Sequence, residues 1–236
     1  MDVNFQPSFL GLNTFKYNGV TLLKPYNGCA RNSVVLRFDT RFEPVYEKFE
    51  TIVTNSKDDL DRVAYSQFTL NRNYMFIESM HTNSSVRSLG IGTCLHLNNI
   101  VEMFKNGIEV IELSASSTAI PFHLRLGFKP CDIWTDNMIR NLRYIASERD
   151  YRLKSFSESA KSILSSDYSK DLKARLANNL ISDYITEASK FKDKDELKKL
   201  MRCATQMRLT RSDVLKNKDF YNELFKRYKI DYEIVD

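Results

Sequence analysis

The 236-residue chain contains little glycine, proline and cysteine, with 7, 5 and 4 residues respectively. Metal sites favour short cysteine spacings, and small secreted folds use dense disulfide frameworks. The four cysteines form no close pair; they are Cys29, Cys94, Cys131 and Cys203. We therefore expect four reduced thiols, no bound metal and a cytoplasmic location. Delivery into another cell stays open, because a non-cleaved secretion signal would leave no such mark.

Long apolar runs are also missing. No stretch approaches the roughly 20 apolar residues that cross a bilayer, so we expect no membrane span. The first residues, Met1–Phe5, lack the basic and apolar segments of a cleaved secretory signal. Apolar residues nevertheless make up 42% of the chain and include 15 Phe and 12 Tyr, which is ample for a packed core. This length fits one large domain or two small ones.

Two of the few glycines stand together in the segment Arg87–Thr93, which reads RSLGIGT. An apolar, strand-like segment (Tyr74–Thr82) precedes it, and an amphipathic, helix-like segment (Thr93–Lys105) follows. Glycines at the start of a helix leave backbone N–H groups accessible, and the helix dipole favours an anion there. The pattern predicts a phosphate-binding turn. The alternative is an ordinary strand–turn–helix corner.

A second segment, Ser116–Phe128, reads SSTAIPFHLRLGF. The first segment resembles motif A (Arg-x-x-Gly-x-Gly) of the GNAT (Gcn5-related) N-acetyltransferase superfamily. The second resembles its motif B, Asn-x-x-Ala-x-x-x-Tyr-x-x-x-Gly-Phe, with Ser116 in place of the Asn and His123 in place of the Tyr. The resemblance covers residues 63–135. It implies an α/β fold with a mixed, splayed central sheet and flanking helices.

The resemblance also implies that acetyl-coenzyme A is the co-substrate. Its pyrophosphate would bind five consecutive backbone amides, those of Leu89, Gly90, Ile91, Gly92 and Thr93. Arg87 would add charge nearby, and Thr93 a hydroxyl.

Further cofactor contacts follow from the same resemblance. The pantetheine arm would pair with the strand that ends at Thr82, and a backbone N–H between Met80 and Thr82 would stabilise the oxyanion. A fully paired core strand is the alternative. Ser116 and Arg125 would complete the cofactor contacts.

For catalysis, the resemblance gives His123 the place of the tyrosine acid that protonates the departing thiolate. An imidazolium can supply a proton near neutral pH; the alternative is a surface histidine without a role. Glu78 is the preferred base, with His81 and Glu112 as weaker candidates. Strict alternation along the strand would place Glu78 on one face, together with Met80 and Thr82, and His81 on the other.

Local patterns predict the remaining elements of the first part. We expect one or two strands within the first forty residues, a short amphipathic helix over 44–54 and a hairpin over 63–82 that turns near residues 71–73. A turn or helix start is expected at Asp58-Asp59. A strand over 110–115, a short helix capped by Ser117 or Thr118, and a strand over 128–134 should follow.

The chain changes character after residue 136. Glycine is absent from residues 128–236, proline is absent after Pro130, and apolar residues recur at helical spacing. Four or five helices are expected, the last over Thr210–Tyr228 with Thr210 or Ser212 as its cap. Residues 137–236 hold 22 basic and 16 acidic residues, a net charge of +6. We therefore expect a GNAT-like catalytic domain over residues 1–135 and a basic, all-helical domain over 136–236.

The leading hypothesis is an acetyl-CoA-dependent N-acetyltransferase. A lysine or N-terminus of a protein is the preferred acceptor, because a large helical domain suits a macromolecule. Two alternatives stay open: a catalytically inactive interaction module with the same fold, and a toxin-like enzyme that acetylates aminoacyl-tRNA, whose RNA the basic region would contact. No run of basic residues interleaved with aromatics specifies nucleic acid.

Overall fold

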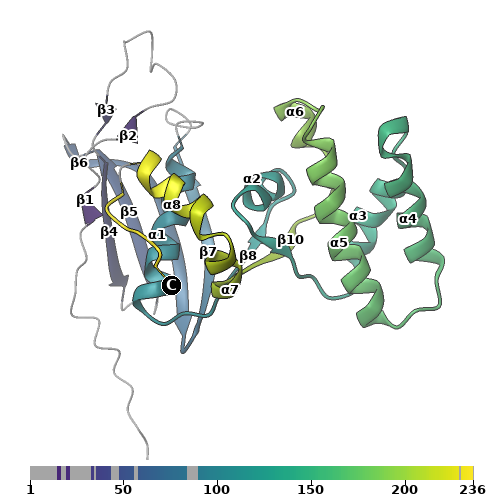
Figure 1. Cartoon of the computed structure of the whole chain (residues 1–236), viewed down its shortest axis with the longest axis horizontal. Coiled ribbons are helices and arrows are strands. Elements are labelled where there is room, and N and C mark those ends of the chain that lie inside the picture. Colours follow the sequence, from purple (N-terminus) through teal and green to yellow (C-terminus); the bar gives the residue numbers. More distant parts are fainter. Residues whose placement is uncertain are drawn as a thin grey trace, which may run out of the picture. The chain divides into compact units, whose positions relative to one another are not determined.

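A computed structural model of the chain shows a mixed α/β architecture (Figure 1). It describes residues 15–16, 20–21, 33–34, 36–43, 48–55, 58–83, 90–228 and 230–235. The chain divides into two compact units: unit 1 comprises residues 1–72, 77–106 and 217–236, and unit 2 comprises residues 73–76 and 107–216. This division differs from the boundary expected at residue 135: residues 107–135 belong to unit 2, and residues 217–236 return to unit 1.

Unit 1 is built on antiparallel strands. Its strands are β1 (Phe15–Lys16), β4 (Leu36–Glu43), β5 (Lys48–Asn55), β6 (Asp58–Asn71) and most of β7 (Tyr74–Thr82), while β2 (Val20–Thr21) pairs with β3 (Ser33–Val34). The hairpin expected over 63–82 is confirmed, with Arg72 and Asn73 at its turn. The helix expected over 44–54 is wrong, and Asp58-Asp59 begins β6 instead of a turn or helix. In β5, strand alternation buries Phe49, Thr51 and Val53 on one face.

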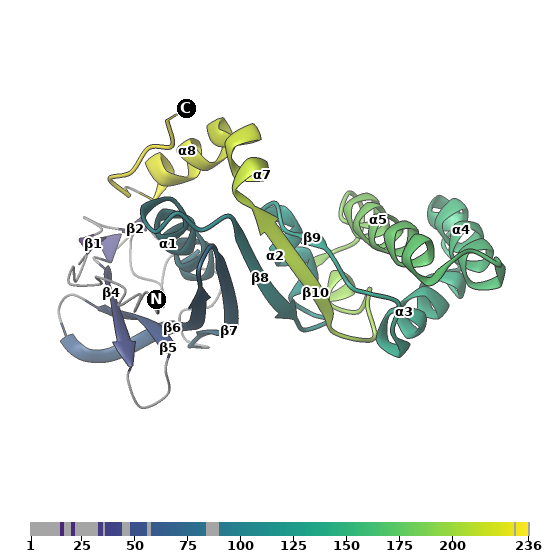
Figure 2. The same cartoon turned by 90° about the horizontal axis from the view of Figure 1, so that it is seen from below.

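Two helices, α1 (Ile91–Lys105) and α8 (Lys218–Arg227), contact each other on one side of this sheet (Figure 2). The side-chain amide of Asn98 in α1 donates to the hydroxyl of Thr51, 3.4 Å away, which places α1 over the buried face of β5. The helix expected after Thr93 is thus confirmed. The helix expected over Thr210–Tyr228 is instead two helices, α7 (Arg211–Lys216) and α8, and Thr210 caps the first by accepting from the amide of Asp213 at 3.0 Å.

Unit 2 combines a small sheet with helices. Its strands are the start of β7, β8 (Val110–Ala115), β9 (Lys129–Pro130) and β10 (Thr205–Thr210), and β10 pairs antiparallel with both β8 and β9. The amides of Glu109 and Val110 donate to the carbonyl of Asn73 at 2.7 and 3.3 Å, so the start of β7 and β8 run in parallel. The strand expected over 110–115 is confirmed, whereas the one expected over 128–134 is limited to two residues.

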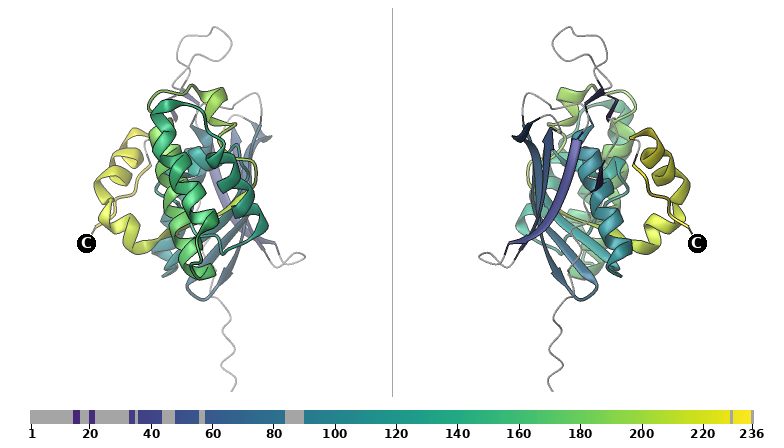
Figure 3. Two further views of the ribbon diagram at one scale, coloured as in Figure 1. Left: turned by 90° about the vertical axis from the view of Figure 1, so that its right-hand side faces the viewer. Right: turned by 90° about the vertical axis from the view of Figure 1, so that its left-hand side faces the viewer.

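Helices make up the rest of unit 2 (Figure 3). They are α2 (Ile120–Arg125), α3 (Asp136–Ala146), the 3-10 helix η2 (Tyr151–Leu153), α4 (Lys154–Ser165), α5 (Lys170–Ala188) and α6 (Lys194–Leu197). Helices follow residue 136 as expected, but the described residues form six α-helices there instead of four or five, and the region is not all-helical because β10 interrupts it. In β10, Thr205, Met207 and Leu209 are buried, while Gln206 and Arg208 between them are exposed. None of the helices in the described parts of the chain is both long and apolar enough to cross a membrane.

Candidate functional site

The predicted phosphate-binding turn, called the anion turn from here on, lies in unit 1, at the start of α1. Gly90 is the N-cap residue, with a left-handed φ of 90° that favours glycine, and its carbonyl accepts from the amide of Cys94 at 3.0 Å. Glycine offers no side chain to cap the helix, so the amides of Ile91, Gly92 and Thr93 form an uncapped helix N-terminus. Arg87 and Leu89 lie outside the described residues.

The phenol ring of Tyr228 lies against this turn. A Cβ atom added to Gly90 would stand 2.5 Å from the Tyr228 Oη and 2.7 Å from its Cε1. Tyr228 is only 5% exposed, and burial raises its pKa. Gly90 is therefore required for the backbone conformation and for the packing of Tyr228. A ring from the chain's own C-terminal segment occupies the space beside the predicted anion turn.

Strand β7 carries one extra residue relative to its partner β6. At the hairpin turn, Asn71 stands opposite Tyr74, whereas further along the amide of Asn83 donates to the carbonyl of Val63, 2.9 Å away. Between these two points β7 is one residue longer than β6. Such an insertion is a β-bulge, which disturbs the alternation of side chains and is frequent beside functional sites.

Side-chain contacts place the bulge at Glu78 and Ser79. Glu50 and Gln67 face each other across β5 and β6, and their side chains hydrogen-bond at 3.3 Å, which defines the polar face of the sheet, opposite α1. Lys48, on the same face as Glu50, forms an ion pair with Glu78. The hydroxyl of Ser79 donates to Gln67 Oε1 at 3.1 Å, so two consecutive residues of β7 point to the polar face.

The bulge corrects the prediction based on strict alternation. His81 stacks on Tyr65, with ring centroids 5.6 Å apart, and Tyr65 shares the polar face with Gln67. Glu78 and His81 therefore lie on the same face. Met80 and Thr82, both half-buried, alternate to the opposite one. Sequence alone does not show this, since nothing in the residue pattern marks the inserted position.

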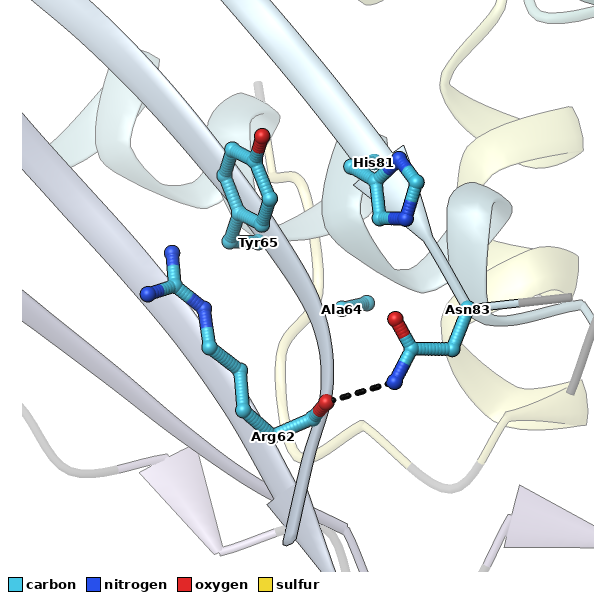
Figure 4. A pocket seen from close by; sticks show the side chains of 5 residues that line it. All are labelled: Arg62, Ala64, Tyr65, His81 and Asn83. Atoms are coloured by element: carbon cyan, nitrogen blue, oxygen red, sulfur yellow. Dashed lines mark hydrogen bonds between the residues drawn. The ribbon is translucent and has the colours of Figure 1, made fainter. Parts of the chain in front are cut away.

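A hollow of about 330 Å³ opens beside His81 (Figure 4). It is lined by Arg62, Ala64, Tyr65, His81 and Asn83. The Arg62 guanidinium lies 4.3 Å from the centroid of the Tyr65 ring, and the Asn83 side chain donates to the Arg62 carbonyl at 2.8 Å. The polar groups of these side chains surround the small Ala64. Three lining residues, Arg62, Tyr65 and Asn83, were not predicted from the sequence, because only the hairpin register brings them to His81.

His123, in unit 2, does not have the environment of an acid. Its ring is 7% exposed and packs edge-to-face against Phe122 and Phe128, with centroids 5.1 and 5.7 Å away. Burial lowers its pKa to about 4, because the charged imidazolium is poorly solvated there. This low pKa disfavours a charged imidazolium near neutral pH, and the role of His123 as the acid that protonates the thiolate stays a prediction.

Other predicted residues of unit 2 have structural partners. Glu112 accepts from Tyr74 Oη at 2.7 Å and from Arg208 Nε at 2.5 Å, so both this carboxylate and that of Glu78, in its ion pair with Lys48, have partners. Burial, followed by the bond to Glu112, raises the pKa of Tyr74 to about 12.

The two cofactor candidates of unit 2 lie at α2. The Ser116 carbonyl accepts from the amides of Ala119 and Ile120, at 2.8 and 3.2 Å, just before α2. The expected cap at Ser117 or Thr118 is wrong, because the N-cap is Ala119. Arg125 is exposed. The described residues hold no cluster of three or more potential metal ligands.

Comparison with known proteins gives partial matches to acetyltransferases. No family model and no curated protein matches the chain. A GNAT-family acetyltransferase from Staphylococcus aureus is 20% identical over 36% of this chain and 55% of its own, with a TM-score of 0.33. A GNAT-family acetyltransferase from Elizabethkingia anophelis, with acetyl-CoA bound, is 10% identical over 39% and 61%, with a TM-score of 0.35.

A third solved structure is the PaiA N-acetyltransferase from Thermoplasma acidophilum in complex with coenzyme A. It is 21% identical over 38% of this chain and 55% of its own, with a TM-score of 0.34. The chain thus spans less than two thirds of the length of each of these structures.

Proposed function

We propose that the protein is an acetyl-CoA-dependent N-acetyltransferase that acts on an amine of a protein, either a lysine or an N-terminus. The observation that carries the proposal is the order of features in unit 1: a bulged strand, β7, followed by a helix that starts at a glycine and has no side-chain cap. Such a helix start binds phosphate through backbone amides and the helix dipole. It fits the coenzyme diphosphate once the ring of Tyr228 moves.

In this proposal, acetyl-CoA supplies the thioester carbon that the amine attacks. The amine gains the acetyl group, the carbon–sulfur bond breaks, and coenzyme A leaves as a thiol. The chain supplies the groups that take the proton from the ammonium form of the acceptor. Glu78 is the preferred base, and His81 the second candidate, because the bulge brings both to the polar face of β7. An oxyanion contact from a backbone N–H between Met80 and Thr82 remains part of the proposal.

The polar face of unit 1 supports a lysine or an N-terminus of a protein as the proposed acceptor. Glu78 and the His81 hollow lie on the side of unit 1 opposite α1, and Arg62, Tyr65 and Asn83 add polar groups there. A flexible lysine side chain or a peptide N-terminus can reach such an exposed surface. A further candidate function, a catalytically inactive interaction module, is favoured by two observations: the neutral, buried His123 and the ring of Tyr228 at the anion turn.

The affinity of a Gly92→Asp variant for coenzyme A tests the proposal. The first turn of α1 contains no acidic residue. An aspartate there suits the helix dipole, so folding should be preserved, but its charge repels a diphosphate. Calorimetry with coenzyme A should show a loss of affinity of about tenfold or more. Gly107→Asp, beyond the other end of α1, is the charge-matched control. A Cβ there meets nothing within 4 Å, and aspartate tolerates the left-handed φ of 64° at a modest cost in stability, so this variant should bind as the wild type does. Equal affinity in all three proteins would refute a diphosphate site at α1.

The rate of turnover tests whether Glu78 is the catalytic base. Glu78→Gln should lower the release of coenzyme A from acetyl-CoA with a lysine peptide by about 10²-fold, without changing the affinity for coenzyme A. Ser79→Ala, at the neighbouring position of the bulge, is the control and should stay near the wild-type rate. No turnover by the wild type with lysine or N-terminal peptides, despite binding of coenzyme A, would favour the interaction module.

A further inference from the structure

We infer that Tyr228 is a resident plug of the anion turn: its phenol ring closes the start of α1 in the free protein, and a coenzyme diphosphate has to displace it. The inference rests on the proposed function, since both concern the same turn. It adds a residue from the far end of the chain to the site, and it makes coenzyme binding depend on the C-terminal segment, defined here as residues 218–235.

The short distances between the Tyr228 ring and Gly90 are the first support for this inference. Three atoms of Tyr228, Oη, Cε1 and Cζ, lie 2.5, 2.7 and 3.0 Å from the place of a Cβ on Gly90. A phosphate held by the first amides of α1 would lie about 3 Å from their nitrogens, directly beside the same turn. Ring and anion therefore compete for the space beside Gly90.

The C-terminal segment holds the ring in place. Tyr221 and Phe225 of α8 are each 1% exposed. Beyond the helix, the amide of Ile230 donates to the carbonyl of Phe225 at 2.9 Å. The side chain of Asn222 binds the backbone of Ile234 twice, accepting from its amide at 2.8 Å and donating to its carbonyl at 3.1 Å. Both contacts enclose Tyr228 in the sequence, and its own amide donates to the carbonyl of Leu224 at 2.9 Å, so the backbone that carries the ring is restrained.

The chemistry of the phenol makes the plug reversible. A neutral hydroxyl at the helix start offers one weak dipole, whereas a diphosphate brings negative charge and several acceptor oxygens to the same amides. The diphosphate therefore gains more from the turn than the phenol does. The apparent affinity for the coenzyme is reduced by the fraction of molecules in which the ring is in place. Removing the ring should restore the intrinsic affinity.

Calorimetry with coenzyme A tests this directly. Tyr228→Ala should bind about tenfold more tightly than the wild type, and Tyr228→Phe, which keeps the ring but loses the hydroxyl, about two- to threefold more tightly. The matched control is Tyr232→Ala: this tyrosine belongs to the same segment, but its ring packs on Phe225 with centroids 5.3 Å apart. It should bind as the wild type does. Thermal unfolding followed by circular dichroism verifies that each variant is folded.

A second measurement does not need a variant. Saturating the wild type with coenzyme A should raise amide hydrogen exchange in residues 228–235, because the displaced ring loosens its anchors. Unchanged exchange there would contradict the plug. So would equal or weaker binding by Tyr228→Ala, or by Tyr228→Phe if the alanine variant does not fold. In those cases, measurable binding by the wild type leaves the proposed function standing. Absence of binding in the wild type and in every variant overturns the proposed function, and the plug with it.

Discussion

The two units differ in how many of their buried polar side chains have hydrogen-bond partners. In unit 2, Asn141 is fully buried and uses both ends of its amide: its oxygen accepts from the amides of Arg202 and Cys203 at 3.0 and 2.9 Å, and its nitrogen donates to the Cys203 carbonyl at 3.2 Å. In unit 1, Asn99 of α1 is equally buried, yet within the described part of the chain neither of its amide atoms has a partner. The described fold thus supplies hydrogen-bond partners for Asn141 but none for Asn99.

The difference between the units is one of degree. In unit 1, Ser66 on β6 and the oxygen of Asn98 on α1 are also buried without a partner among the described residues. In unit 2, the corresponding atom is Asp132 Oδ2, although Oδ1 of the same carboxylate accepts from the amide of Gln206 at 3.1 Å. Unit 1 also contains the bulge, the hollow and the uncapped start of α1. Unpaired polar groups cost stability, and proteins keep them where they serve a purpose. The contrast therefore favours unit 1 as the place where ligands bind.

The largest expected effect concerns Asn141. Asn141→Leu keeps the volume but leaves the amides of Arg202 and Cys203 without their acceptor, so the free energy of unfolding should fall by about 3 kcal/mol. Urea unfolding followed by far-UV circular dichroism measures it. Asn178→Leu is the control: Asn178 makes two hydrogen bonds to the backbone of Asp132 and is only half-buried, so the loss should be smaller. An equal or smaller loss for Asn141→Leu would contradict the comparison.

The next effect depends on pH and concerns His123. Its pKa in the folded protein, about 4, lies below the ordinary value of 6.5, so the unfolded chain binds more protons between these values. The stability that comes from neutral His123 is present above pH 6.5 and is lost as the pH falls towards 4, by up to about 3 kcal/mol.

A ring without a titratable group should remove this contribution. In His123→Phe, the free energy of unfolding should fall less than in the wild type when the pH is lowered from 7 to 4.5. Phe128→Leu, which changes a neighbour of the His123 ring, should lower stability by the same amount at both pH values. An unaltered pH dependence in His123→Phe would show that His123 has the same pKa in the folded protein as in the unfolded chain.

Sequence patterns predicted the elements whose signals are local. The strand before the glycine turn, α1 and β8 follow from apolar periodicity and from the glycines of the turn, and Thr210 acts as the expected cap. The incorrect predictions concern residues whose secondary structure depends on pairing with other strands. Residues 48–55 have apolar positions that fit a helix as well as a strand, and only pairing with both β4 and β6 selects the strand.

The candidate site was predictable only in part, for the same reason. Gly90 and Thr93 stand where the motif places them, but the contact with Tyr228 joins two residues that are far apart in the sequence. The bulge that brings Glu78 and His81 to one face depends on the register with β6, which residue types alone do not fix. Burial of His123 between two phenylalanines likewise depends on how α2 packs.

Asn99 gives the smallest and most discriminating effect. If its amide is only an unpaired polar group in the core, Asn99→Leu removes a desolvation cost at similar volume and should raise the free energy of unfolding by about 1 kcal/mol. Urea unfolding measures this, with Asn99→Ala as the control, which removes the same amide but leaves a cavity and should be less stable than Asn99→Leu. A loss as large as that of Asn141→Leu would mean that Asn99 is paired in solution, for example through a buried water, and that the two units satisfy their polar cores equally.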